Sequence, residues 1–146
     1  MESLYPFTLI IHIFCAIIFV GYLFFDVVIF SRAKKNLSQE LAQQIQESIT
    51  KKAIKIMPIC VVLLILTGGM MMSRWVGSEI GFFDTTFQKI FMLKVAFASL
   101  IFIMVAISLI FKFVIKKPNP LNKIIHPLAL TLAILIVLCA KLMFYV

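Results

Sequence analysis

Tyr5–Phe30 reads YPFTLIIHIFCAIIFVGYLFFDVVIF, and this stretch decides the fold. Apart from His12 and Asp26, it contains no acidic, basic or imidazole side chain. A helix needs about 20 apolar residues to cross the hydrocarbon core of a bilayer. A segment in lipid must also satisfy its own backbone hydrogen bonds, which an isolated strand cannot do. We therefore predict a transmembrane helix.

Three further apolar stretches follow, at Ala53–Ser73, Ile90–Phe111 and Ile124–Val146. Hydrophobic residues make up 63% of the 146-residue chain and charged residues only 14%, against averages of about half and a quarter in globular proteins. The predicted fold class is therefore all-α, a transmembrane four-helix bundle of up-down-up-down topology. Residues 1–146 form a single membrane domain in this prediction.

The basic residues predict the orientation of this bundle. Two connections carry them, the first with Arg32, Lys34, Lys35, Lys51, Lys52 and Lys55, and the third with Lys112, Lys116, Lys117 and Lys123. Cytoplasmic loops collect Lys and Arg, so we expect both termini on the extracytoplasmic side of a bacterial inner membrane. The net charge of +8 is explained in the same way, because the lysines flank the spans. We expect no nucleic-acid partner.

The connections have recognisable signals of their own. Apolar side chains recur every fourth position at Leu37, Leu41, Ile45 and Ile49. This spacing predicts an amphipathic cytoplasmic helix over residues 37–52 that continues into the second span. Asn36, three residues before Gln39, is a candidate start signal for that helix. The prolines of the Lys117–Pro120 segment are expected to end the third helix.

With this orientation, soft metal ligands gather in the outer half of the bundle. His12 and Cys15 are three residues apart and share a helix face, and Cys139 and Met143 are four apart. Sulfur ligands together with imidazole select Cu(I). The predicted metal site comprises His12, Cys15, Met70, Met71, Met92, Cys139 and Met143. The alternative is that the methionines and cysteines are ordinary apolar packing residues.

Ionisable residues inside a membrane span are costly and indicate function. Lys94 lies in the third span beside small residues, and its alternative reading is a lysine that extends to the interface. Asp26, Cys60 and His126 form a predicted inner relay toward the cytoplasmic side. For Asp26 the alternative is pairing with a nearby lysine, and for His126 an interfacial position.

The run His12-Ile-Phe-Cys-Ala-Ile-Ile-Phe-Val-Gly21 is similar to the first helix of two families of small four-helix membrane proteins. These are the copper resistance D (CopD) domain and the HemJ-type protoporphyrinogen oxidase. Pro58 with Thr67-Gly68 resembles their second helix, and Leu93-Lys94 the start of their third. The Asp26–Arg32 segment departs from the HemJ pattern, since it lacks the expected Pro-Arg and Tyr-His pairs. The resemblance implies copper movement across the membrane, or haem b-dependent oxidation of a haem precursor with His12 as ligand and Lys94 near the substrate.

Three functions follow from these observations. The first is copper handling, with Cu(I) captured at the outer mouth and passed inward toward Cys60. The second is a haem b oxidoreductase in which Lys94 positions the substrate. The third is a non-catalytic subunit of a membrane complex. The expected partners are the lipid bilayer and a metal ion or haem, with a second copy of the chain or another membrane subunit left open.

Overall fold

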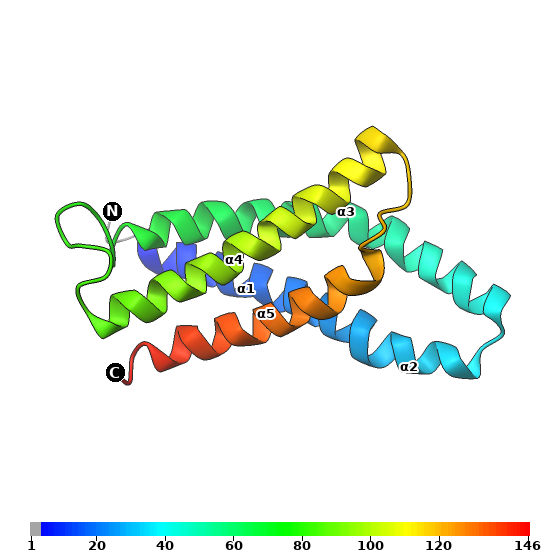
Figure 1. Cartoon of the computed structure of the whole chain (residues 1–146), viewed down its shortest axis with the longest axis horizontal. Helices are drawn as coiled ribbons and strands as arrows, with labels where there is room; N and C mark the ends of the chain where they lie inside the picture. The colour runs from blue at the N-terminus through cyan, green and yellow to red at the C-terminus, as the bar shows by residue number, and fades with distance from the viewer. Residues whose placement is uncertain (1–3) are drawn as a thin grey trace. The chain divides into compact units, whose positions relative to one another are not determined.

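The computed structural model describes residues 4–146, and every long apolar stretch in it is helical (Figure 1). The helices are α1 (Tyr5–Phe24), α2 (Ser31–Ala33), α3 (Gln39–Met72), α4 (Thr86–Ile110) and α5 (Asn122–Leu142). Two π-helical segments, η2 (Phe25–Phe30) and η4 (Phe111–Ile115), extend α1 and α4, and a 3₁₀ turn, η3 (Lys34–Asn36), follows α2. The all-α class is confirmed.

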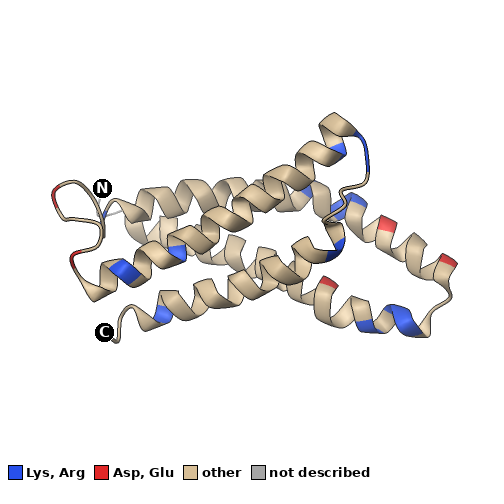
Figure 2. Ribbon diagram, in the orientation of Figure 1, with Lys and Arg blue, Asp and Glu red and all other residues tan. Residues whose placement is uncertain are grey.

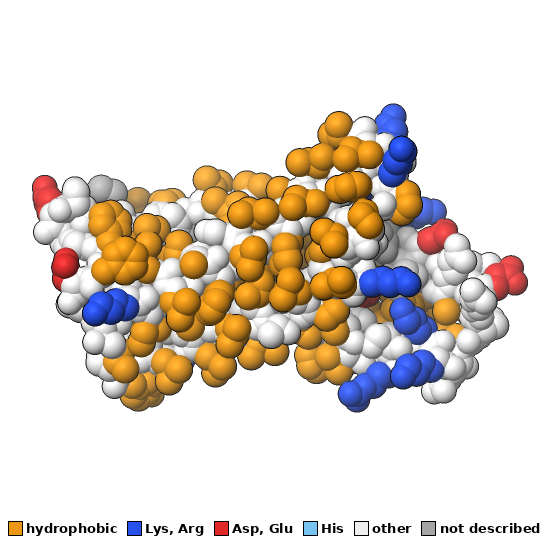
Figure 3. Space-filling model, in the orientation of Figure 1, with side chains coloured by type: hydrophobic (Ala, Val, Ile, Leu, Met, Phe, Trp, Pro, Cys, Tyr) orange, Lys and Arg blue, Asp and Glu red, His pale blue; other side chains and the backbone are white. Residues whose placement is uncertain are grey.

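Within residues 4–146, four helical stretches are long and apolar enough to cross a membrane. They are Tyr5–Asn36, Gln39–Met72, Thr86–Ile115 and Asn122–Leu142. Each contains most of one predicted span, so helix length and hydropathy identify a multi-pass membrane protein. Hydrophobic side chains also dominate the face shown in Figure 3, as expected of helices that contact lipid.

The chain divides into two compact units, Met1–Ser73 and Arg74–Val146. In the first unit, α1 packs against α3. The buried side chains of α1 are Thr8, Cys15, Phe19 and Leu23, and those of α3 are Cys60, Val61, Leu64 and Thr67. Most of them are three, four or seven residues from the next, so they form one stripe along each helix. We call the contact between these two stripes the α1–α3 seam.

The start of α3 differs from its predicted signal. Asn36 lies in the preceding 3₁₀ turn η3, and the cap is Ser38, whose hydroxyl accepts a hydrogen bond from the backbone N–H of Leu41 at 3.3 Å. Serine and asparagine are equally good caps, and Ser38 is used because it lies directly before the first turn of α3. From there α3 continues without interruption for 34 residues, past Pro58, to Met72.

In the second unit, α4 packs against α5. A capping box starts α4, in which the Thr85 hydroxyl accepts from the Gln88 N–H and the Gln88 side chain accepts from the Thr85 N–H. Trp75 lies against Phe87, with ring centroids 5.0 Å apart, and Phe144 contacts both rings. These aromatic contacts hold the loop that precedes α4 and the residues that follow α5 on one hydrophobic cluster.

The last two long helices end at Ile115 and at Leu142. The α4–η4 helix ends at Ile115, and Lys116 adopts a left-handed conformation with φ 54° just before the proline-containing segment. The final helix ends at Leu142, four residues before the predicted end of the fourth span at Val146. Lys and Arg gather near the α2 end of the first unit (Figure 2). Which side of the membrane this end faces stays a prediction.

Candidate functional site

His12 and Thr67 make the hydrogen bond that organises the α1–α3 seam. The Nδ1 of His12 lies 2.8 Å from the Thr67 hydroxyl oxygen. That hydroxyl donates its own proton to the Leu63 carbonyl at 2.6 Å. A Thr67 hydroxyl that donates to Leu63 accepts from His12, because a hydroxyl has a single proton to donate. That arrangement corresponds to the tautomer protonated at Nδ1, in which the lone pair is at Nε2, the atom that can ligate a metal.

Gly68 makes room for the His12 ring. A Cβ added at position 68 would lie 3.3 Å from the His12 Cε1 atom, which is closer than ordinary van der Waals contact. At the neighbouring Gly69, an added Cβ would meet nothing within 4 Å. The absence of a side chain at position 68 thus lets the imidazole lie directly against the backbone of α3.

Cys15 and Cys60 form a thiol pair in the same seam. Both are free cysteines, and both are buried, with 6% and 5% of their surfaces exposed. The two thiols lie close enough to interact electrostatically across the seam. Cys15 follows His12 by three residues and therefore lies about one turn away on the same face of α1.

Methionine side chains occupy both ends of this arrangement. Met57 lies three residues before Cys60, and Met71 lies three residues after Gly68, so each shares a face of α3 with a seam residue. Both are partly buried. Met70, by contrast, is 59% exposed and points away from the seam. The seam thus carries thioether, imidazole and thiol groups along one line.

The second unit brings together two other predicted site residues. The Lys94 ammonium lies 4.4 Å from the centre of the Phe91 ring, a cation–π contact between residues one turn apart. Cys139 of α5 lies within electrostatic range of this ammonium. Met143 is buried one turn after Cys139, and Met92 is partly buried on α4. Lys94 thus lies within the α4–α5 pair, close to the predicted thiol ligand.

The predicted inner relay is more dispersed. Asp26 accepts a hydrogen bond from the Gln46 amide at 3.4 Å, and its pairing with a nearby lysine stays a prediction. Gln46 precedes Cys60 by about four turns of α3, so Asp26 and Cys60 lie at different levels of the seam. His126 lies near the start of α5 in the second unit.

Among residues 4–146, no group of three or more His, Cys, Asp or Glu side chains lies close enough together to hold a metal ion. The predicted seven-residue site draws on both units and stays a prediction. Sequence reasoning missed the roles of Thr67 and the Cys15–Cys60 contact. Both depend on how α1 and α3 are offset along their axes, which the sequence pattern does not contain.

In comparisons with known proteins, the chain matches no family model, no curated protein and no solved structure. The resemblance to the CopD and HemJ families therefore depends on the residues quoted above. Three of those residues are close together in the structure, since His12 bonds to Thr67 and lies against Gly68.

Proposed function

We propose that this multi-pass membrane protein binds Cu(I) and moves it along the α1–α3 seam. The observation that carries the proposal is the buried Cys15–Cys60 pair one turn from an imidazole whose orientation is set by Thr67. Thiolate, thioether and imidazole form the ligand set that favours Cu(I) over harder divalent ions. The order of groups along the seam provides successive ligands for a single moving ion.

Each group has a distinct role in this proposal. Met71 and His12 receive the ion at one end of the seam, and His12 does so through Nε2. Cys15 and Cys60 bind it next, and each thiol must release its proton to become a ligand. Met57, one turn from Cys60, is the following ligand. Because the thiols are buried, water is kept from the bound ion at the midpoint of the path.

Copper binding by the purified protein is the first test. We expect the detergent-solubilised chain to retain Cu(I) against a competing chelator. Cys15→Ala and Cys60→Ala should each lower the copper affinity at least tenfold. Changes to residues that only support a metal ligand already cost 10–100-fold in affinity, and loss of the ligand itself should cost at least as much. His12→Ala should also weaken binding. Cys139→Ala is the matched control, because Cys139 lies on α5 in the other unit. Equal affinities for all four variants would contradict the proposal.

A haem b site is the second candidate, and the His12–Thr67 bond is the observation that favours it. An imidazole that donates from Nδ1 to a protein oxygen presents Nε2 as an axial ligand equally well. The absorption spectrum of the purified protein separates the two candidates. A Soret band that disappears in His12→Ala indicates haem. A colourless protein that contains stoichiometric copper supports the first proposal.

A further inference from the structure

Two nucleophilic side chains, Cys15 and Cys60, lie on the facing stripes of the α1–α3 seam. Both are free thiols, and only 6% and 5% of their surfaces are exposed. Each belongs to the buried stripe of its own helix, and the two helices pack against each other within the Met1–Ser73 unit. The seam therefore holds two cysteines that are not joined by a covalent bond.

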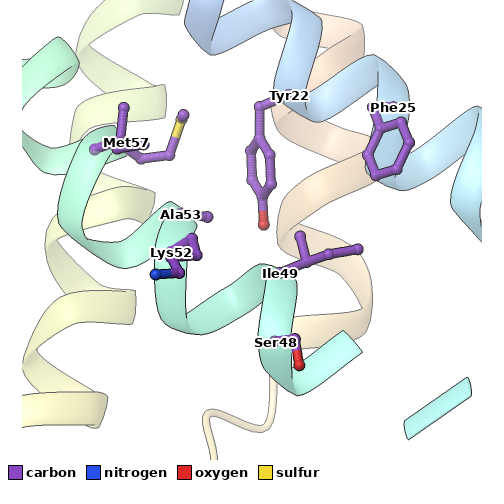
Figure 4. Close-up of a pocket in the computed structure, with 8 residues that line it drawn as sticks. Tyr22, Phe25, Ser48, Ile49, Lys52, Ala53 and Met57 are labelled. Atoms are coloured by element: carbon purple, nitrogen blue, oxygen red, sulfur yellow. The ribbon is translucent and has the colours of Figure 1, made fainter. Parts of the chain in front are cut away.

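Two contacts show how α1 is aligned against α3. His12 bonds to Thr67 near one end of the seam. Further along α1, the Tyr22 side chain points toward the part of α3 that contains Ala53, and both residues line one depression (Figure 4). His12 and Tyr22 are ten residues apart, and Thr67 and Ala53 are fourteen apart. The two helices are thus antiparallel, and a step along α1 corresponds to a slightly longer step along α3.

This alignment brings Cys15 close to Cys60. Cys15 follows His12 by three residues, which correspond to about four residues of α3. Four residues back from Thr67 is Leu63, and Cys60 lies three residues further, which is less than one helical turn. The two thiols are also close enough to interact electrostatically. The alignment of the helices and the burial of both side chains therefore make the thiols neighbours.

We propose that Cys15 and Cys60 form a reversible disulfide that abolishes copper binding in the seam. Cysteines can be joined where their Cα atoms approach within about 7 Å, and small residues let two membrane helices come this close. A disulfide has no thiolate left to act as a metal ligand. The effect on copper rests on the proposed function, whereas formation of the bond does not.

The reaction needs a two-electron oxidant, and hydrogen peroxide is a small neutral one. One thiol sulfur attacks a peroxide oxygen, the O–O bond breaks, and the thiol proton leaves with the departing oxygen as water. The second thiol attacks the resulting sulfenic acid, the S–O bond breaks, and a second water leaves. In total, two thiols and one peroxide give one disulfide and two waters. A soluble dithiol reverses the reaction by thiol–disulfide exchange.

Mass spectrometry of the unchanged protein tests the bond without copper. The reduced protein in detergent is treated with hydrogen peroxide, denatured and labelled with a maleimide. We expect one of the three cysteines, Cys139, to be labelled after oxidation, and all three after dithiothreitol. Peptide mapping should find Cys15 joined to Cys60. Cys139→Ala is the matched control and should still form the bond, whereas Cys60→Ala should contain no disulfide.

Copper affinity is then compared between the reduced and the oxidised protein. We expect oxidation to lower it at least tenfold, as loss of direct ligands should, and dithiothreitol to restore it. A reduced protein that binds Cu(I) but forms no Cys15–Cys60 bond would overturn this inference alone. Equal copper affinity of both forms, or a disulfide to Cys139, would also overturn it. A disulfide in a protein that binds no copper would support the bond and contradict the proposed function.

Discussion

At the scale of single residues, one hydroxyl determines what the imidazole in the seam can do. Thr67 bonds to a carbonyl of its own helix and accepts from His12 at the same time. This pair of bonds fixes the rotation of the ring and favours the tautomer that is protonated at Nδ1. The neighbouring Gly68 lets the ring approach the backbone. Thr67 is thus a positioning residue, whose loss should alter metal binding more than folding.

Thr67→Val and Thr67→Ser separate these effects. Valine keeps the branched shape but removes the acceptor, so we expect copper affinity to fall by about tenfold, as for other residues that orient metal ligands. Serine keeps the hydroxyl and should retain wild-type affinity. The measurement is a chelator-competition titration of both variants. Identical affinities for Val and Ser would show that the hydroxyl plays no part.

Gly68→Ala and Gly69→Ala form a second matched pair. The added methyl group at position 68 must displace the His12 ring by a few tenths of an ångström, whereas at position 69 it meets nothing within 4 Å. We expect copper affinity to decrease only in Gly68→Ala. Thermal unfolding in detergent gives the control, since alanine favours helix by up to about 1 kcal/mol at both positions. A larger affinity loss in Gly69→Ala would contradict this account.

At the scale of elements, a single buried side chain orders the loop between α3 and α4. The Gln88 carbonyl oxygen accepts from the N–H groups of Asp84 and Thr85 at 3.0 and 3.2 Å. Its amide nitrogen donates to the carbonyls of Trp75, Ile80 and Gly81 at 3.1 to 3.3 Å. An amide provides acceptor and donor faces in the same plane, whereas an ionised carboxylate of the same shape can only accept.

Gln88→Glu should therefore destabilise the loop while preserving its shape. The second carboxylate oxygen would face three carbonyl oxygens, and we expect a loss of about 1–3 kcal/mol from the unsatisfied buried groups. Thermal unfolding and protease cleavage between Trp75 and Thr85 are the measurements. Gln44→Glu on the exposed face of α3 is the control. Unchanged protease resistance in Gln88→Glu would disprove the role of the amide.

The membrane-spanning helices could be predicted from the sequence, because a long apolar segment in a bilayer must be helical. The residues at which the helices begin and end were harder to predict. The cap of α3 is Ser38 rather than Asn36, since a 3₁₀ turn places Asn36 outside the helix. The pairing of Cys15 with Cys60 was not predicted, because it depends on how far α1 and α3 are offset along their axes. Hydropathy contains no information about this offset.

At the scale of the whole molecule, the distribution of lysines predicts the orientation. If both basic connections face the cytoplasm, alkaline phosphatase fused after Val146 should be active, and the same enzyme fused at Pro118 should be inactive. A cytoplasmic fluorescent protein fused at the two sites should give the reverse pattern and serves as the control. Activity at Pro118 would invert the topology. It would also place the His12 end of the seam on the cytoplasmic side.

The length of α3 has one further consequence. Thirty-four residues at about 1.5 Å each span about 51 Å, well beyond a hydrocarbon core of about 30 Å. In a thicker bilayer, the charged side chains of Lys55 and then Lys52 would be buried in the hydrocarbon core, and burying these charges costs free energy. These lysines therefore limit how deeply α3 can insert. In membranes of different thickness, Lys52 and Lys55 should stay at the same membrane–water interface.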